Sequence, residues 1–392
     1  MERHRFAAFS VLLALTTAGS IAAAQAAPAP QASTTTAAAP AAPAPADSTP
    51  NFFKDVQANA FVSFGYLYNF NRTPDQSVGL RFFDSRSNTF SLDGAEFVLQ
   101  KAVAKPNDIG FRVDLVAGSA LAKAQAAGLS LGANGVLQQA FVSYVAPLGT
   151  GMRFDMGKFV THHGYEVIEG YDGYNDNYSR SLLFNYAIPL THTGVKASYA
   201  INSMASATVM LVNGWDNAVD NNASKTIGAQ LALTPAPPLS IFLNYMGGPE
   251  KTDTNGFVRH LGDFVATYKV SDEFSLGLNA DYATEKGASL VKSGDDATWG
   301  GVAGYARFGP ATGLSVGLRA ETFKDNGGTR LGTGTKITAN EFTITPTYKF
   351  SSNFVVRAEG RYDSGDSPIF TDDKGKPTKN QATLGINTMF IY

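Results

Sequence analysis

Cysteine is absent from this sequence, charge is sparse, and long apolar runs do not recur. Without cysteine the chain has no disulfides, thiol nucleophiles or cysteine-ligated metal centres. Only 16% of the 392 residues are charged, and 31 Lys and Arg nearly balance 33 Asp and Glu, so no basic excess indicates a nucleic-acid partner. The long apolar stretch is N-terminal, whereas a helical membrane protein of many spans needs repeated apolar segments of about 20 residues.

The first 50 residues predict an exported leader followed by a spacer. Residues 1–26 combine a basic start, an apolar run over 6–15 and the sequence Ala24-Gln25-Ala26, which is the pattern of a cleaved signal peptide. A short membrane anchor is the alternative, but the run is shorter than the roughly 18 residues that a spanning helix needs. Residues 27–50 are mainly Ala, Pro, Ser and Thr, which cannot build a core, so we expect a disordered linker there.

From residue 51 to residue 392, apolar and polar residues alternate with the period of two that is typical of β-strands. Between Ile109 and Leu115, for example, odd positions are apolar and even positions are glycine or charged. The pattern predicts strands near 59–70, 90–102, 109–118, 136–146, 151–160, 193–202, 205–213, 226–234, 238–247, 258–270, 273–283, 298–308, 314–323, 340–350, 353–362 and 381–392. Short connections alternate with long ones, which indicates an antiparallel up-and-down barrel of about 16 strands, with short periplasmic turns and long extracellular loops.

Alternation alone also fits a pair of soluble β-sandwiches, and the number of strands decides between the two folds. Side chains can fill a barrel of about eight strands but not one of about sixteen, so the apolar face of this barrel must point outward into lipid. We therefore predict an all-β transmembrane barrel over residues 51–392, in the bacterial outer membrane. The last strand ends on Tyr392, and a terminal aromatic residue on an amphipathic strand favours recognition by the outer-membrane assembly machinery.

Several short motifs are concentrated between residues 156 and 217. They are Gly157-Lys158-Phe159, Gly164-Tyr165-Glu166, Asn177-Tyr178-Ser179-Arg180, Pro189, His192-Thr193-Gly194 and Asn213-Gly214-Trp215. With these motifs the sequence resembles the OmpL-like beta-barrel porin family of Gram-negative outer membranes, over essentially all of residues 51–392. The resemblance implies a porin and leaves its solutes undefined, and the linker over 27–50 lies outside it.

The longest connection, 161–192, is a candidate constriction of the pore. Among its tyrosines it carries four carboxylates and an arginine: Glu166, Glu169, Asp172, Asp176 and Arg180. In general porins the loop at this position folds into the lumen and narrows it, so by analogy we expect the same here. An ordinary extracellular loop at the rim is the alternative.

The strands supply arginines on the predicted lumen face, namely Arg112, Arg153, Arg319, Arg357 and Arg361. If they opposed the acidic loop across a narrow opening, they would create a transverse field that orients solutes. Pairing along each strand is the alternative, because carboxylates lie two residues away on the same face. These carboxylates are Asp114, Asp155, Glu321 and Glu359.

Lys158 falls on the lipid-facing side of its predicted strand, which is a costly place for a charge. A position above the apolar band would remove this cost. We expect instead a bulge at Gly157 that turns Lys158 inward, which would make it a further pore-lining residue.

These features predict a porin that lets small hydrophilic solutes diffuse passively, without a reaction, a cofactor or a metal. A structural or adhesive barrel with a plugged lumen is one alternative, and an outer-membrane hydrolase is another. His162 and His163 are adjacent, so on a strand they would point to opposite faces and could not easily share one ion. The expected partners are outer-membrane lipid, small solutes, the assembly machinery and, in a homotrimer, further copies of the chain.

Overall fold

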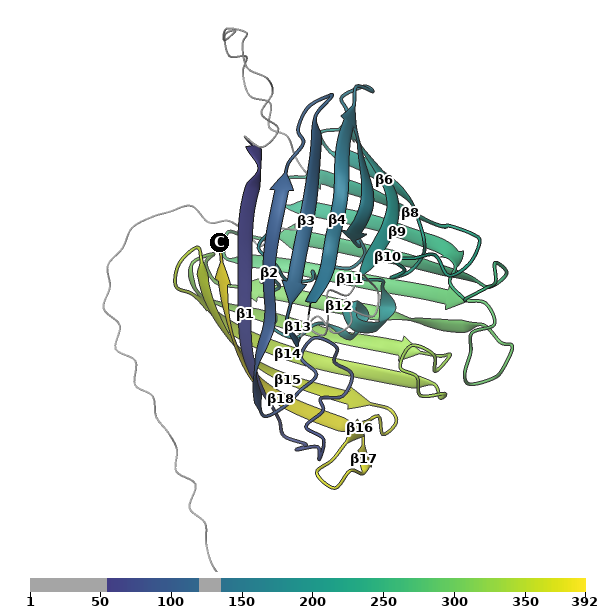
Figure 1. Cartoon of the computed structure of the whole chain (residues 1–392). Coiled ribbons are helices and arrows are strands. Elements are labelled where there is room, and N and C mark those ends of the chain that lie inside the picture. Colours follow the sequence, from purple (N-terminus) through teal and green to yellow (C-terminus); the bar gives the residue numbers. More distant parts are fainter. Residues whose placement is uncertain (1–54, 120–134) are drawn as a thin grey trace, which may run out of the picture.

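The alternating strands close into a barrel in the computed structural model (Figure 1). The structure describes residues 55–119 and 135–392, and over these residues sixteen antiparallel strands form the barrel. They are β1 (Gln57–Asn69), β2 (Thr89–Lys101), β3 (Ile109–Ala117), β4 (Gly135–Ala146), β5 (Met152–Val160), β6 (Thr191–Asn202), β7 (Ala205–Val212), β8 (Thr226–Ala236), β9 (Leu239–Pro249), β10 (Val258–Lys269), β11 (Phe274–Glu285), β12 (Ala297–Phe308), β13 (Gly313–Asp325), β14 (Ile337–Lys349), β15 (Phe354–Gly365) and β18 (Asn380–Ile391). The connection between β15 and β18 adds a separate two-stranded sheet of β16 (Phe370–Thr371) and β17 (Pro377–Thr378).

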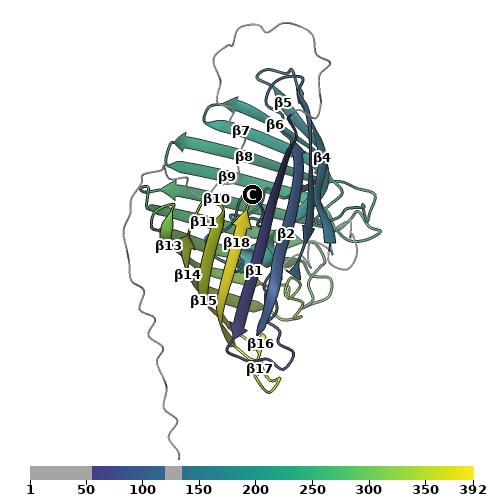
Figure 2. The ribbon, with the colours of Figure 1, turned by 60° about the vertical axis from the view of Figure 1, so that its left-hand side comes forward.

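The first and last strands close the ring. Figure 2 shows β1 beside β18, and their register pairs Phe61 with Ile391. The pairing extends to the end of the chain, where Tyr392 N donates to Ala60 O at 2.8 Å and Ala60 N donates to Tyr392 O at 2.9 Å. Closure of this kind satisfies the backbone groups that an open sheet would expose to lipid.

Connections at the two ends of the barrel differ in length. The short ones are 102–108, 147–151, 203–204, 237–238, 270–273, 309–312 and 350–353, and all of them join strands at the same end. The opposite end carries the long connections, of which 161–190 is the longest. The predicted barrel is confirmed, with strand ends displaced by a few residues. The predicted leader over 1–26 and the linker over 27–50 lie outside the described residues.

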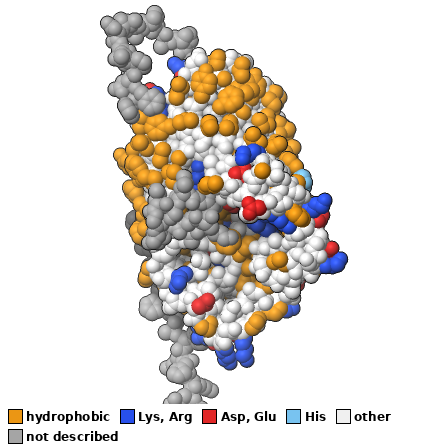
Figure 3. All heavy atoms as spheres, turned by 45° about the vertical axis from the view of Figure 1, so that its right-hand side comes forward, with side chains coloured by type: hydrophobic (Ala, Val, Ile, Leu, Met, Phe, Trp, Pro, Cys, Tyr) orange, Lys and Arg blue, Asp and Glu red, His pale blue; other side chains and the backbone are white. Residues whose placement is uncertain are grey.

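Apolar side chains face outward from the barrel and polar ones face inward. Leu278, Leu314 and Phe390 are exposed on the outer face, whereas Arg319 and Thr343 are buried inside. Figure 3 shows hydrophobic side chains over a wide part of the outer surface. Within the part of the chain that the structure describes, helices long and apolar enough to cross a membrane are absent.

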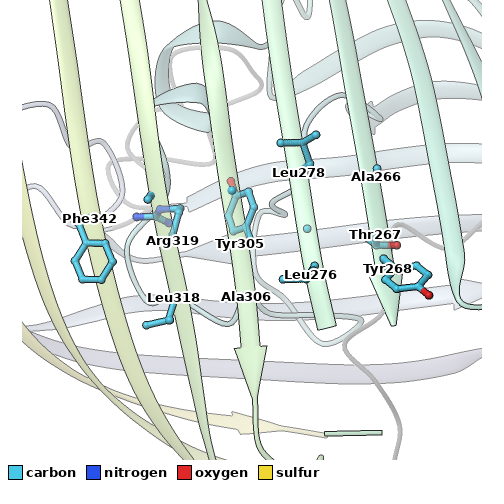
Figure 4. Close-up of a pocket in the computed structure, with 13 residues that line it drawn as sticks. Ala266, Thr267, Tyr268, Leu276, Leu278, Tyr305, Ala306, Leu318, Arg319 and Phe342 are labelled. Atoms are coloured by element: carbon cyan, nitrogen blue, oxygen red, sulfur yellow. The ribbon is translucent and has the colours of Figure 1, made fainter. Parts of the chain in front are cut away.

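A shallow hollow in the outer wall lies over β10 to β14 (Figure 4). Ala306 on β12 lies between the larger Leu276 on β11 and Leu318 on β13, and Ala266 on β10 lies beside Leu278. These side chains stand on the same face as the exposed apolar residues of their strands. The hollow therefore belongs to the lipid-facing surface rather than to a path for polar solutes.

Candidate functional site

The connection between β5 and β6, residues 161–190, lies inside the barrel (Figure 1). It contains the short π-helix η3 (Leu183–Ala187), all of whose residues are buried. Gly164 N donates to Asp263 Oδ2 on β10 at 3.0 Å, and Tyr171 N donates to Glu96 Oε2 on β2 at 2.7 Å. Seven strands separate β2 from β10 in either direction around the ring, so the loop crosses the lumen.

Two glutamates of the wall accept hydrogen bonds from the backbone of this loop. Glu359 on β15 accepts from Tyr178 N at 2.6 Å and from Ser179 N at 3.1 Å. Glu321 on β13 accepts from Leu183 N at 3.2 Å and also from the preceding amide. A buried loop must find partners for its peptide groups, and these carboxylates supply them.

Two buried ion pairs join the loop to the wall. Arg319 Nη1 lies 2.6 Å from Glu166 Oε1, and Arg357 Nη1 lies 2.7 Å from Glu169 Oε1. Both guanidinium side chains have an exposed fraction of 0%. Burial alone would raise the pKa of Glu169, but Arg180 and Arg357 outweigh it and lower the pKa to about 2. The carboxylate is therefore ionised and firmly held at neutral pH.

The other two acidic residues of the loop pair with arginines nearer to solvent. Asp172 Oδ2 lies 2.7 Å from Arg112 Nη1 on β3, and Asp176 Oδ1 lies 3.4 Å from Arg307 Nε on β12. Both aspartates are partly exposed. All four predicted acidic residues of the loop thus contact an arginine of the wall, instead of facing it across an open gap. The expected transverse field requires opposite charges on the two sides of an open gap, and these four pairs are in direct contact instead.

Glycines on the lumen face make room for tyrosines of the loop. A Cβ atom at Gly277 would lie 2.4 Å from the ring of Tyr165, and one at Gly65 would lie 2.2 Å from the hydroxyl of Tyr178. The ring of Tyr165 also stacks on that of Tyr305 with 4.0 Å between centroids. The close approach of loop and wall therefore depends on positions without a side chain.

Pairing along one strand is correct for two of the predicted pairs. Arg112 Nε lies 2.8 Å from Asp114 Oδ1, and Arg153 Nε lies 2.7 Å from Asp155 Oδ1. It is wrong for Glu321 and Glu359. Arg319 pairs with Glu341 on β14 at 2.7 Å, and Arg357 pairs with Glu169 of the loop at 2.7 Å.

Several charged residues of the lumen wall are missing from the sequence prediction, among them Asp363, Glu341 and Arg307. Arg361 pairs with Asp363 at 2.6 Å, and Glu341 and Arg307 take part in the pairs described above. Each of the three has an apolar or aromatic neighbour on the outer face: Phe308 follows Arg307 on β12, Phe342 follows Glu341 on β14, and Tyr362 precedes Asp363 on β15. Strand alternation could have indicated Arg307 and Glu341, which lie within the predicted strands 298–308 and 340–350, whereas Asp363 lies one residue beyond the predicted end of 353–362.

The expected bulge at Gly157 is wrong. The register of β5 continues through Gly157 to both neighbouring strands, so Lys158 lies on the face opposite to Asp155 and Phe159. Its ammonium group is nevertheless buried, because Nζ donates to the backbone oxygen of Leu137 on β4 at 2.9 Å. A hydrogen bond to the neighbouring strand, rather than a turn into the lumen, accommodates this charge.

The histidines lie at the start of the loop, beyond the end of β5. The rings of His162 and His163 stack with 4.5 Å between centroids, so the expectation of opposite faces does not hold outside a strand. Thr161 Oγ1 lies 3.1 Å from His163 Nδ1 and 3.1 Å from His192 Nε2. Among the described residues, no group of three or more His, Cys, Asp or Glu residues is arranged to hold a metal ion.

The barrel is closed, its outer surface is apolar, its interior is charged, and a long loop is folded into its lumen. These features are those of the outer-membrane porins. Residues 55–392 match the family described as Putative beta-barrel porin-2, OmpL-like. The chain belongs to this family and is an outer-membrane porin. Curated proteins gave no sequence match.

Solved porin structures share the fold at low sequence identity. The outer-membrane channel DcaP of Acinetobacter baumannii superposes with a TM-score of 0.58 at 12% identity, covering 86% of this chain and 97% of that one. An anion-selective porin from Comamonas acidovorans gives 0.58 at 11% identity, with 86% and 99% covered. OmpF of Salmonella typhi, in a complex with daunomycin, gives 0.53 at 15% identity, with 86% and 97% covered. At such identities the likeness concerns the fold alone.

Proposed function

We propose that the lumen is a water-filled path for passive diffusion of small hydrophilic solutes, that residues 161–190 form its narrowest part, and that the protein catalyses no reaction. The observation that carries this proposal is the loop itself, which reaches from Glu96 on one side of the barrel to Asp263 on the other. A loop held across a polar lumen reduces its cross-section and sets the size of solute that passes.

Single-channel conductance in a planar bilayer tests the proposal. Deletion of residues 170–177 removes the contacts of Tyr171, Asp172 and Asp176 with the wall and keeps Glu166 and Glu169, which pair with Arg319 and Arg357. We expect a higher conductance and a relaxed size limit for solutes, with heat-modifiable mobility on gels showing that the barrel still folds. The matched control is deletion of residues 372–375 in the exposed turn between β16 and β17, which should leave the conductance unchanged.

The outcomes separate the alternatives. Unchanged conductance after deletion of 170–177 would reject the constriction and keep the channel. A folded wild-type barrel without any conductance would instead favour the structural or adhesive barrel with a plugged lumen.

The remaining partners and the export route are part of the same proposal. We propose that residues 1–26 direct export and are cleaved, and that the final strand ending on Tyr392 is read by the assembly machinery. A homotrimer in outer-membrane lipid is the proposed assembly, and OmpT of Vibrio cholerae, a porin-fold neighbour, is described in a trimer form. Sequencing of the mature N-terminus and cross-linking of intact cells test these points.

A further inference from the structure

We infer that the lumen face of β5 and β6 carries a binding site for small anions, formed by Arg153 and Lys196, which both contact the buried Asp155. This inference rests on the proposed function as a diffusion channel and adds the class of solute that the channel prefers. It concerns the wall of the barrel, whereas the constriction concerns the loop.

The site contains two cations and one carboxylate. Asp155 Oδ1 accepts from Arg153 Nε at 2.7 Å and from Ser143 Oγ at 2.6 Å, while Oδ2 lies 3.5 Å from Lys196 Nζ. The register places Asp155 directly opposite Lys196, so the three charged groups share one face of adjacent strands. The carboxylate compensates one of the two cations, and the cluster keeps one net positive charge.

Exposure distinguishes this cluster from the other arginines of the lumen. The side chain of Arg153 is 31% exposed and that of Lys196 is 24% exposed, whereas Asp155 between them is only 3% exposed. The arginines of the other lumen ion pairs described above are 15% exposed or fully buried, namely Arg112, Arg307, Arg319, Arg357 and Arg361. A solute on this side of the lumen therefore meets the cations before it meets the carboxylate.

Among the residues that the structure describes, Asp155 is the carboxylate that pairs with these cations, and their other contacts are uncharged. Arg153 Nη2 donates to Ser143 Oγ at 3.2 Å, and Lys196 Nζ lies 4.6 Å from the centre of the Phe159 ring. Exposed carboxylates of the loop are held elsewhere, as Asp172 is by Arg112. A guanidinium beside an ammonium binds oxyanions such as phosphate or carboxylate through charge-assisted hydrogen bonds.

The first test is the reversal potential of the reconstituted channel in a potassium chloride gradient. We expect the wild type to prefer chloride, and the variant Arg153→Gln/Lys196→Gln to lower the chloride-to-potassium permeability ratio by about two- to fivefold. Asp155→Asn should change the ratio in the opposite direction, because it leaves both cations uncompensated. Lys374→Gln, which removes a positive charge from the exposed turn between β16 and β17, is the matched control and should leave the ratio unchanged.

A second test uses inorganic phosphate as the probe. Millimolar phosphate should reduce the chloride current of the wild type, and Lys196→Gln alone should weaken this block. This variant keeps both hydrogen bonds that Asp155 Oδ1 accepts, from Arg153 and Ser143. The anion site would be rejected, and the channel retained, if the channel conducts but prefers potassium. The same holds if the chloride-to-potassium permeability ratio is unchanged by all three substitutions. Absence of any conductance would overturn the channel, and the anion site with it.

Discussion

At the scale of the residue, Arg319 joins two strands of the wall to the loop. It donates to Glu166 at 2.6 Å, to the backbone oxygen of Ser179 at 2.7 Å and to Glu341 at 2.7 Å, and its side chain is fully buried. A buried pair of this kind adds little net stability compared with an apolar replacement of both partners. Removal of one partner alone is costly, because the other charge stays buried and unpaired.

We therefore expect Arg319→Met to destabilise the barrel by about 3–5 kcal/mol, since Glu166 and Glu341 lose their common partner. The measurement is a urea titration after refolding into lipid. Arg153→Met is the matched control. Its loss should cost about 1 kcal/mol or less, because that side chain is partly exposed and Lys196 still lies 3.5 Å from Asp155. Equal costs for the two variants would contradict the buried network.

Single residues also show where prediction from sequence ends. Strand alternation correctly places Arg319, Glu321 and Glu359 on the inner face, because side chains alternate strictly along a strand. It cannot tell which neighbour each residue pairs with. That choice depends on the register between strands and on a loop that is distant in sequence, so both glutamates bind loop amides instead of their nearest arginines.

At the scale of the element, successive residues of strand β11 face the lipid and the lumen in turn. Leu278 faces outward and is exposed, whereas Gly277 beside it lies against the ring of Tyr165 in the lumen. Alternation alone would treat Gly277 as a tolerant, water-facing position. In the structure an added Cβ atom would lie 2.4 Å from this ring, so a side chain at this position fits only if the Tyr165 ring moves.

Leu278→Arg should destabilise the barrel by about 2–4 kcal/mol, because the charge enters the hydrocarbon region at the middle of a strand. The same substitution at Leu290, an exposed residue of the long connection between β11 and β12, is the control and should have little effect. Both are measured by urea titration in lipid. If the two variants unfolded alike, the assignment of the outer face would be wrong.

The loop over 161–190 is the element whose position depended on analogy rather than on pattern. Its sequence has no period that indicates a strand, and its acidic residues fit a solvated rim as well as a buried site. What fixes it inside the barrel is distributed over the wall, in carboxylates such as Glu96 and Asp263 and in glycines such as Gly277. Such long-range partners become visible only once the ring is closed.

At the scale of the whole molecule, the two ends of the barrel differ, and this difference sets its orientation in the membrane. Short turns gather at one end with the start of β1 and the end of β18, and long connections gather at the other. In outer-membrane barrels the short turns are periplasmic and the long loops extracellular. The absence of cysteine from the sequence makes this orientation directly testable, because any introduced thiol is the sole site for a reagent.

Single cysteines at Asn326 and Lys374, both exposed in long connections, should react with a membrane-impermeant maleimide on intact cells. Cysteines at Pro237 and Ala311, in short turns at the opposite end, should react only after the outer membrane is permeabilised. Reaction of all four in detergent-solubilised barrels checks that each thiol is accessible in the folded protein. Because β1 pairs with β18 along its length, both termini of the barrel must lie at the end of the short turns. Labelling of Pro237 and Ala311 but not of Asn326 and Lys374 on intact cells would invert the barrel and place the loop 161–190 at the periplasmic mouth.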